Sequence, residues 1–141
     1  MKIQLIAFLL VVSISASSQI RIEKKPVTLV QLKGGEWNAE LAMDSSSGVK
    51  LYYFLFRNNR YRELVDVKLL PLASTADLKQ FGEAFKTALK IKTDDRVTTK
   101  DYFITKAKAF GFTGYTLFYN DASCELSSKM VQKLIDAIDK L

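Results

Sequence analysis

The chain contains no histidine and only one cysteine, Cys124, among its 141 residues. Histidine is the commonest general base and the commonest zinc ligand, so its absence excludes Ser-His-Asp and Cys-His catalytic arrangements. A single cysteine excludes an intramolecular disulfide and a thiolate metal cage. We interpret Cys124 as a small, partly buried residue at the start of the last helix, and a nucleophile or an intermolecular bridge are the alternatives. No metal and no cofactor are therefore expected.

The glycines do not form a phosphate-binding loop, because Gly34-Gly35 lies between two strand-like segments and not before a helix. The charged residues form no long run of one sign, and the sequence has no internal repeat or low-complexity tract. A carboxylate pair such as Glu63 and Asp66 remains as a catalytic option, but a small two-layer domain offers little cleft for it. We therefore expect a non-catalytic protein, with a small carboxylate-dependent hydrolase as the alternative.

Residues 1–18 have the layout of a secretory signal peptide. Lys2 gives a short positive start, an apolar run follows over 3–14, and small residues fill 15–18. An uncleaved anchor or a buried first strand is the alternative, although the run is short for a bilayer span. Cleavage after Ser18 removes only Lys2 from the formal net charge of +6 and leaves +5. We expect an exported protein, periplasmic or extracellular, with no transmembrane segment in the mature chain.

Three hairpins are predicted, over 27–43, 49–70 and 101–120. The first turns at Gly34-Gly35, because glycine adopts a positive φ without strain. The second contains the densest apolar block of the mature chain and turns at Asn58-Asn59, with a loop over 58–61 as the rival. The third turns at 111–114, and the side that carries Phe103, Thr105, Ala107, Ala109, Thr116 and Phe118 suits helix packing. The predicted core side of the second hairpin consists of Tyr52, Phe54, Phe56, Tyr61, Val65, Val67 and Leu69.

Two amphipathic helices are predicted, over 74–90 and 123–141. Ser74 is the expected N-cap of the first helix, and Gly82 is a small residue that lets this helix lie close to the sheet. Ser123 or Asp121 caps the second helix, and residues 91–100 form a polar connector. The order ββββ-α-ββ-α predicts one α+β domain over 19–141. Its two layers are an antiparallel sheet of about six strands, built from three hairpins, and two helices on one face.

Strand alternation places several cations and tyrosines on the other side of the second and third hairpins. If the helices cover the opposite face, these side chains share one open face of the sheet. Arginine binds phosphate, sulfate or carboxylate groups through paired hydrogen bonds, and tyrosine stacks on sugars or bases. The candidate ligand-binding residues are Tyr53, Arg57, Arg60, Arg62, Lys106, Lys108, Tyr115 and Tyr119.

These observations predict an exported binding protein that takes an anionic envelope component or an acidic protein on the basic sheet face. Nucleic acid is not expected as the partner, because the predicted export favours envelope polysaccharide, lipid head groups or an acidic protein. A simpler interpretation is that the cations only keep an exposed face soluble. A self-associating structural envelope protein is a further alternative, and the sequence does not indicate the oligomeric state.

Overall fold

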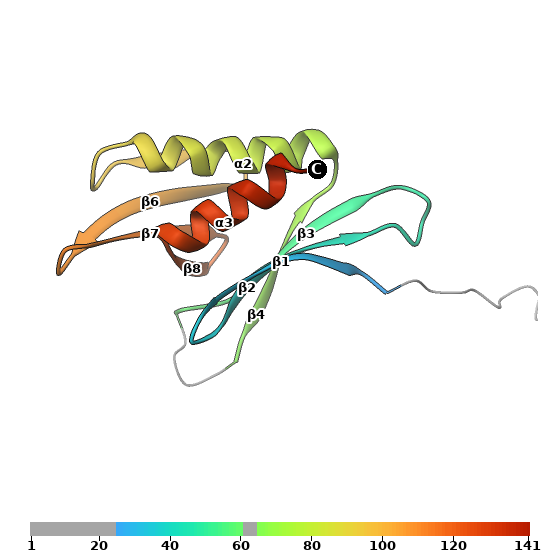
Figure 1. The fold of residues 1–141 in the computed structure, drawn as a ribbon, viewed down its shortest axis with the longest axis horizontal. Coiled ribbons are helices and arrows are strands. Elements are labelled where there is room, and N and C mark those ends of the chain that lie inside the picture. The colour runs from blue at the N-terminus through green and yellow to red at the C-terminus, as the bar shows by residue number, and fades with distance from the viewer. Residues whose placement is uncertain (1–24, 61–64) are drawn as a thin grey trace, which may run out of the picture.

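The computed structural model describes residues 25–60 and 65–141, and it has an α+β fold (Figure 1). Within these ranges the chain forms two antiparallel sheets of four strands each and two helices. The first sheet has the order β1-β2-β3-β4 and contains β1 (Val27–Gly34), β2 (Glu36–Asp44), β3 (Leu51–Arg57) and β4 (Val67–Leu72). The second has the order β5-β6-β7-β8 and contains β5 (Arg96–Thr98), β6 (Tyr102–Ala109), β7 (Phe112–Tyr119) and β8 (Ala122–Ser127). The helices are α2 (Thr75–Lys90) and α3 (Ser128–Asp139).

The α+β class and the antiparallel pairing are as predicted, but the single sheet of about six strands is wrong. Strand β5 lies in the segment predicted to be a polar connector, and β8 lies in the segment predicted to be the first turn of the last helix. The element order is therefore ββββ-α-ββββ-α over the described residues. The signal peptide predicted over residues 1–18 lies outside the described residues.

The β1–β2 hairpin turns at Gly35, whose φ of 93° favours glycine. A two-residue turn at Gly34-Gly35 predicts Lys33 opposite Glu36, but Gly34 pairs with Glu36 and Lys33 with Trp37, which is a one-residue shift. A Cβ on Gly34 would come within 2.6 Å of Met130 Cε. The hairpin end therefore lies close against the start of α3.

The second hairpin confirms the core side of β3 and corrects the core side of β4. Tyr52, Phe54 and Phe56 are buried as predicted, but Arg57 pairs with Val67, which leaves an odd number of residues in the connection. An odd connection exchanges the two faces of the second strand. Val67 is consequently 48% exposed and Val65 78% exposed, and the core positions of β4 are instead Leu70 and Leu72.

The face of the third hairpin that packs against the helices is the one opposite to the prediction. Ile104, Tyr115 and Leu117 are buried, whereas Phe103 and Phe118 stack on the outer face with ring centroids 4.6 Å apart. The guanidinium of Arg96 lies 5.4 Å from the centroid of the Phe103 ring. Both faces carry large apolar side chains, so alternation alone did not identify the covered one.

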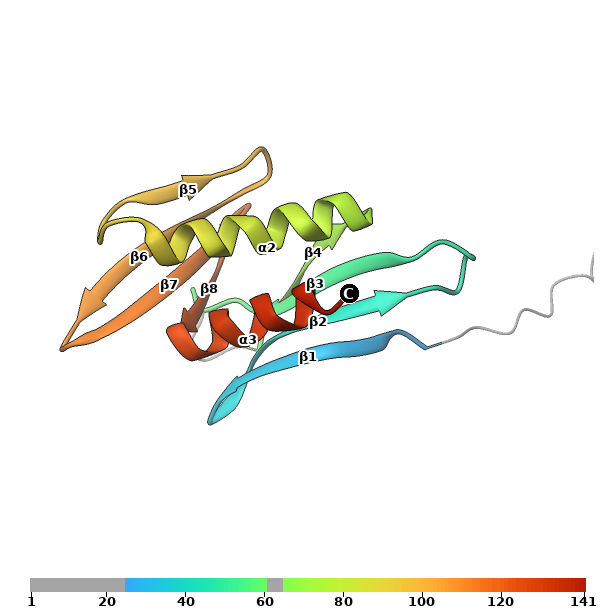
Figure 2. The ribbon, with the colours of Figure 1, turned by 45° about the horizontal axis from the view of Figure 1, so that its top comes forward.

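Each helix contacts both sheets, and the two helices lie side by side over them (Figure 2). Ser74 caps α2 as predicted and accepts a hydrogen bond from Asp77 N, whereas α3 starts at Ser128 with Ser127 as its cap. The close neighbour of Gly82 is Ile138 of α3, and not the sheet. Neither helix among the described residues is long and apolar enough to cross a lipid bilayer.

Three asparagines, two through their side chains and one through its backbone, join the free edge of β8 to the first sheet. The Oδ1 atom of Asn58 accepts hydrogen bonds from the backbone N–H groups of Ser123 and Arg60, at 3.1 and 3.2 Å. The backbone N–H of Asn59 donates to Ser123 O at 2.8 Å, and Asn38 Nδ2 donates to the backbone oxygen of Glu125 at 3.3 Å. One continuous core takes buried residues from both sheets and both helices.

Candidate functional site

The residues predicted to share one open face are divided between several surfaces. Tyr53 and Arg57 lie on the outer face of the first sheet and are partly exposed. Tyr115 is on the helix-covered face of the second sheet and only 4% exposed, because Leu117 and Ile104 beside it belong to the core. The predicted continuous face of cations and tyrosines is therefore wrong, since its premise was that the helices cover the opposite side of the third hairpin.

Lys106 and Arg60 bind backbone groups of the same chain. The Nζ atom of Lys106 donates to the carbonyl oxygens of Leu89 and Ile91, each at 2.9 Å, where α2 ends. This contact places a cation at the negative end of the helix dipole. The Arg60 guanidinium donates to the carbonyl oxygen of Asp121 at 3.4 Å.

Tyr119 and Lys108, the two other described candidates, lie at opposite ends of the β6–β7 hairpin. Tyr119 is partly exposed and lines a hollow with Asp66 and Lys68, whereas Lys108 is exposed near the end of β6. Arg62 lies outside the described residues.

A hollow beside Arg57 combines charges of both signs. Arg57 Nη1 lies 2.6 Å from Glu36 Oε2, and Glu36 is largely exposed. The hollow has a volume of about 250 Å³ and is also lined by Trp37 and Glu125. Strand alternation in the first hairpin predicts Trp37 on the core side, but Trp37 is partly exposed and donates from Nε1 to Glu40 Oε2 at 3.2 Å. Arg57 is already paired with Glu36, and Glu125 adds a second carboxylate to the lining. This hollow therefore has little excess positive charge to attract an anion.

A second hollow, which we call the lysine hollow, lies between edge strand β1 and the start of α3. It has a volume of about 440 Å³ and is lined by Lys33 on one side and by Lys129 and Lys133 on the other. Lys133 Nζ donates to the carbonyl oxygen of Gln31 at 3.0 Å. No acidic residue is among the described residues that line this hollow. Within residues 25–60 and 65–141, Lys33 and Lys129 form no ion pair.

The first turn of α3 adds to the positive potential of the lysine hollow. The Ser127 side chain caps the helix by accepting from Met130 N at 3.2 Å, and the first turn contains no acidic residue. The N-terminal end of a helix carries a partial positive charge, which attracts anions most strongly within the first turn. Both Ser127 and Met130 line the hollow.

An apolar groove adjoins the lysine hollow, and we call it the hairpin groove. It has a volume of about 640 Å³ and shares Gly34, Ser127 and Met130 with the lysine hollow. The residues that line it come from the end of the β6–β7 hairpin, the end of the β1–β2 hairpin, and the segment from β8 into α3. Figure 1 shows where these hairpins and α3 lie. Its lining consists of Gly34, Asn38, Ala107, Ala109, Phe112, Thr113, Gly114, Tyr115, Thr116, Glu125, Leu126, Ser127 and Met130.

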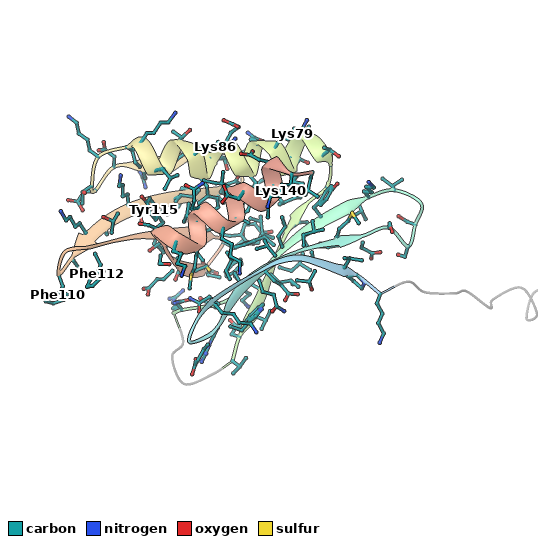
Figure 3. The ribbon with its side chains drawn as sticks, viewed as in Figure 1. Lys79, Lys86, Phe110, Phe112, Tyr115 and Lys140 are labelled. Atoms are coloured by element: carbon teal, nitrogen blue, oxygen red, sulfur yellow. The ribbon has the colours of Figure 1, made fainter. Side chains whose placement is uncertain are left out.

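The end of the β6–β7 hairpin exposes two phenylalanines, which we call the aromatic tip. Phe110 is 100% exposed and Phe112 is 80% exposed. Figure 3 shows both at the projecting end of the hairpin, away from the labelled Lys79, Lys86 and Lys140 of the helices. Phe110 and Gly111 form the turn with φ values of 52° and 82°. A positive φ is uncommon for a bulky residue and favours asparagine or glycine.

Asp66, the described member of the carboxylate pair considered for hydrolysis, does not show the pKa shift that a general acid needs. A hydrogen bond from Asn58 and then one from Lys68 lower the pKa of Asp66 below its ordinary value. A carboxylic acid that donates a proton near neutral pH needs a raised pKa. Glu63 lies outside the described residues. Asp66 therefore gives no support to the hydrolase alternative.

Cys124 is fully buried in β8, and not at the start of the last helix as predicted. Burial raises the pKa of its thiol to about 12. The thiolate is the reactive form, so the native thiol is expected to resist iodoacetamide at about pH 8. Mass spectrometry should show alkylation only after urea unfolds the chain. Equal alkylation rates with and without urea would contradict the burial of this residue.

The same shift predicts a loss of stability in alkali. An unfolded thiol ionises near its ordinary value of 9.0, whereas the native thiol stays protonated up to about 12. The unfolded chain then binds fewer protons, so the free energy of unfolding falls as pH rises above about 9. Tyr102 adds to this fall, because burial raises its pKa from 10.0 to about 12. Urea midpoints at about pH 8 and about pH 10 should show the decline, and it should be shallower in Cys124→Ala.

Sequence reasoning missed both the lysine hollow and the aromatic tip. Lys129 and Lys133 lie in the polar half of the predicted last helix, and their i, i+4 spacing is the signal that both point to one side. The turn predicted at 111–114 contains Gly111 and Phe112 and directly follows Phe110, and no role was predicted for either phenylalanine. Among the described residues, no group of three or more histidine, cysteine, aspartate or glutamate side chains is placed to hold a metal ion.

Comparisons with models of protein families, with curated proteins and with solved structures gave no match.

Proposed function

We propose that this chain is an exported, non-catalytic protein that binds an anionic ligand in the lysine hollow. The observation that carries the proposal is the convergence of Lys33, Lys129 and Lys133 on one hollow with no acidic residue in its described lining. The proposal keeps the anionic ligand predicted from the sequence and moves its site from the strand face to the gap between β1 and α3.

The geometry suits a compact multivalent anion such as a phosphate, sulfate or carboxylate group. Lysine ammonium groups act as point charges with three donors each, and the first turn of α3 adds backbone N–H groups. Edge strand β1 supplies Gln31, whose carbonyl already holds Lys133 in place at 3.0 Å. Because these lysines are exposed, binding is expected to weaken with added salt.

Replacement of all three lysines by glutamine tests the proposal with sodium pyrophosphate as the probe. In the unaltered protein, pyrophosphate should shift the amide resonances of Lys33 and of residues 127–133. The triple variant should bind at least about tenfold more weakly, because exposed charge contacts contribute roughly 0.2–1 kcal/mol each and act together here. The affinity is read from the same nuclear magnetic resonance titration.

The matched control is Lys50→Gln, Lys79→Gln and Lys140→Gln, which changes the net charge by the same amount at exposed positions away from the hollow. This variant should retain most of the affinity. Equal weakening of both triple variants would show that pyrophosphate responds only to net charge, and the lysine hollow would then be rejected as its site.

A further inference from the structure

The aromatic tip has no role inside the molecule. Phe110 is 100% exposed, so its ring stabilises no described part of the fold. Its φ of 52° is one that asparagine or glycine adopts more easily. The Phe110 side chain is unfavourable for the turn and makes no contact within the described fold. This combination indicates that its ring makes a contact outside the chain. Phe112, at 80% exposure, extends this apolar surface into the hairpin groove.

The lysine hollow lies next to this apolar surface. The hairpin groove and the lysine hollow share Gly34, Ser127 and Met130, so apolar and cationic groups occur side by side. Glu125 is the one acidic residue among the described lining of the groove, and it does not line the lysine hollow. Apolar side chains beside lysines match the interface of an anionic bilayer, where head-group phosphates overlie acyl chains.

We propose that the aromatic tip inserts into an anionic lipid bilayer while the lysine hollow binds the head-group phosphates. This inference rests on the proposed anion binding and names the source of the anion. A single soluble amphiphile would fill the groove but would leave Phe110 in water, because this ring projects beyond the groove lining. A bilayer surface covers Phe110 and Phe112 together, and the positive formal net charge, +6 for the full chain and +5 without residues 1–18, favours an anionic one.

Sedimentation with vesicles tests the insertion. The protein should bind vesicles of phosphatidylglycerol and phosphatidylcholine, and not vesicles of phosphatidylcholine alone. The variant Phe110→Asn with Phe112→Thr should bind the anionic vesicles at least about tenfold more weakly, because burial of aromatic rings contributes strongly to interfacial binding. Its binding of pyrophosphate should be unchanged. Phe110→Asn alone should not lower the melting temperature, since asparagine suits a positive φ.

A matched control is Val49→Thr, which removes an exposed apolar side chain from the β2–β3 connection. This variant should bind vesicles as the unaltered protein does. A depth readout comes from Trp37→Phe with Phe110→Trp, which places the single tryptophan at the tip. Its emission should shift to the blue on anionic vesicles, as expected for an indole that leaves water.

The outcomes separate this inference from the proposed function. Pyrophosphate binding without vesicle binding would overturn the insertion and leave the lysine hollow intact. Vesicle binding that survives the two phenylalanine substitutions would reject the aromatic tip as the contact. Binding of monomeric dodecyl phosphate without vesicle binding would replace the bilayer by a soluble amphiphile. If the unaltered protein bound neither pyrophosphate nor anionic vesicles, both proposals would be rejected.

Discussion

Replacing Asn58 by alanine is expected to lower the free energy of unfolding by about 3 kcal/mol, because it removes a buried side chain that makes three hydrogen bonds and leaves two partly buried backbone donors without their acceptor. The Asn58 residue is only 2% exposed. Its Oδ1 accepts from the backbone N–H groups of Ser123 and Arg60, and its Nδ2 donates to Asp66 Oδ2 at 3.0 Å. Since Ser123 belongs to β8 and Asn58 follows β3, the substitution also loosens the junction between the two sheets. Urea unfolding followed by circular dichroism measures the effect.

Asn59→Ala is the matched control. Asn59 contributes to the same junction through its backbone N–H, which donates to Ser123 O at 2.8 Å. Alanine retains that N–H, so the loss should stay within about 0.5 kcal/mol, as for ordinary surface substitutions. If both alanine variants lost the same stability, the hydrogen bonds of the Asn58 side chain would not be what holds β8 to the first sheet.

The second large effect is expected at the crossing of the two helices. A Cβ on Gly82 would lie 3.1 Å from Ile138 Cγ2, in a contact that is already tight. Leucine at this buried position has no space, and overpacking of this kind costs about 1–3 kcal/mol. This cost outweighs the gain of up to about 1 kcal/mol in helix propensity that replacing glycine brings. Gly82→Leu should therefore lower the urea midpoint, and Gln80→Leu on the exposed side of α2 should not.

A double-mutant cycle separates the clash from other effects at this crossing. Ile138→Ala removes Cγ2 and creates a cavity, so it should destabilise the protein alone. In combination, Gly82→Ala should fill part of that cavity, and the two free-energy changes should not add. Additive changes would show that Gly82 and Ile138 do not limit the approach of α2 and α3.

Local sequence signals correctly predicted the helices and strands whose positions depend on the residues within them. Ser74 and Asp77 mark the start of α2, and the alternation of Tyr52, Phe54 and Phe56 marks a strand with one buried face. Strand β8 was missed because Leu126 continues the helical spacing of Met130 and Leu134 backwards, and because Ser123 suits a helix cap as well as Ser127 does. Propensity alone does not distinguish two serines four residues apart.

The rest depended on contacts between distant segments. The covered face of the third hairpin follows from how α2 and α3 lie across both sheets, which the hairpin sequence does not encode. The lysine hollow likewise combines Lys33 of β1 with Lys129 and Lys133 of α3. Sequence separation hides such a cluster until the strand order is known. The three lysines of the proposed site were therefore not among the candidate ligand-binding residues predicted from the sequence.

The arrangement of α3 across β1 also bears on how the chain reaches its native state. Lys133 contacts the carbonyl of Gln31, which lies 102 residues earlier in the chain. The first strand therefore gains its cover from the last helix, and such long closures slow folding because the chain must lose much entropy before the contact forms. During synthesis, which starts at the N-terminus, β1 stays uncovered until α3 has been made. We therefore expect the chain to fold in one cooperative event after its synthesis is complete. The N-terminal half alone is not expected to be stable if a chaperone releases it early.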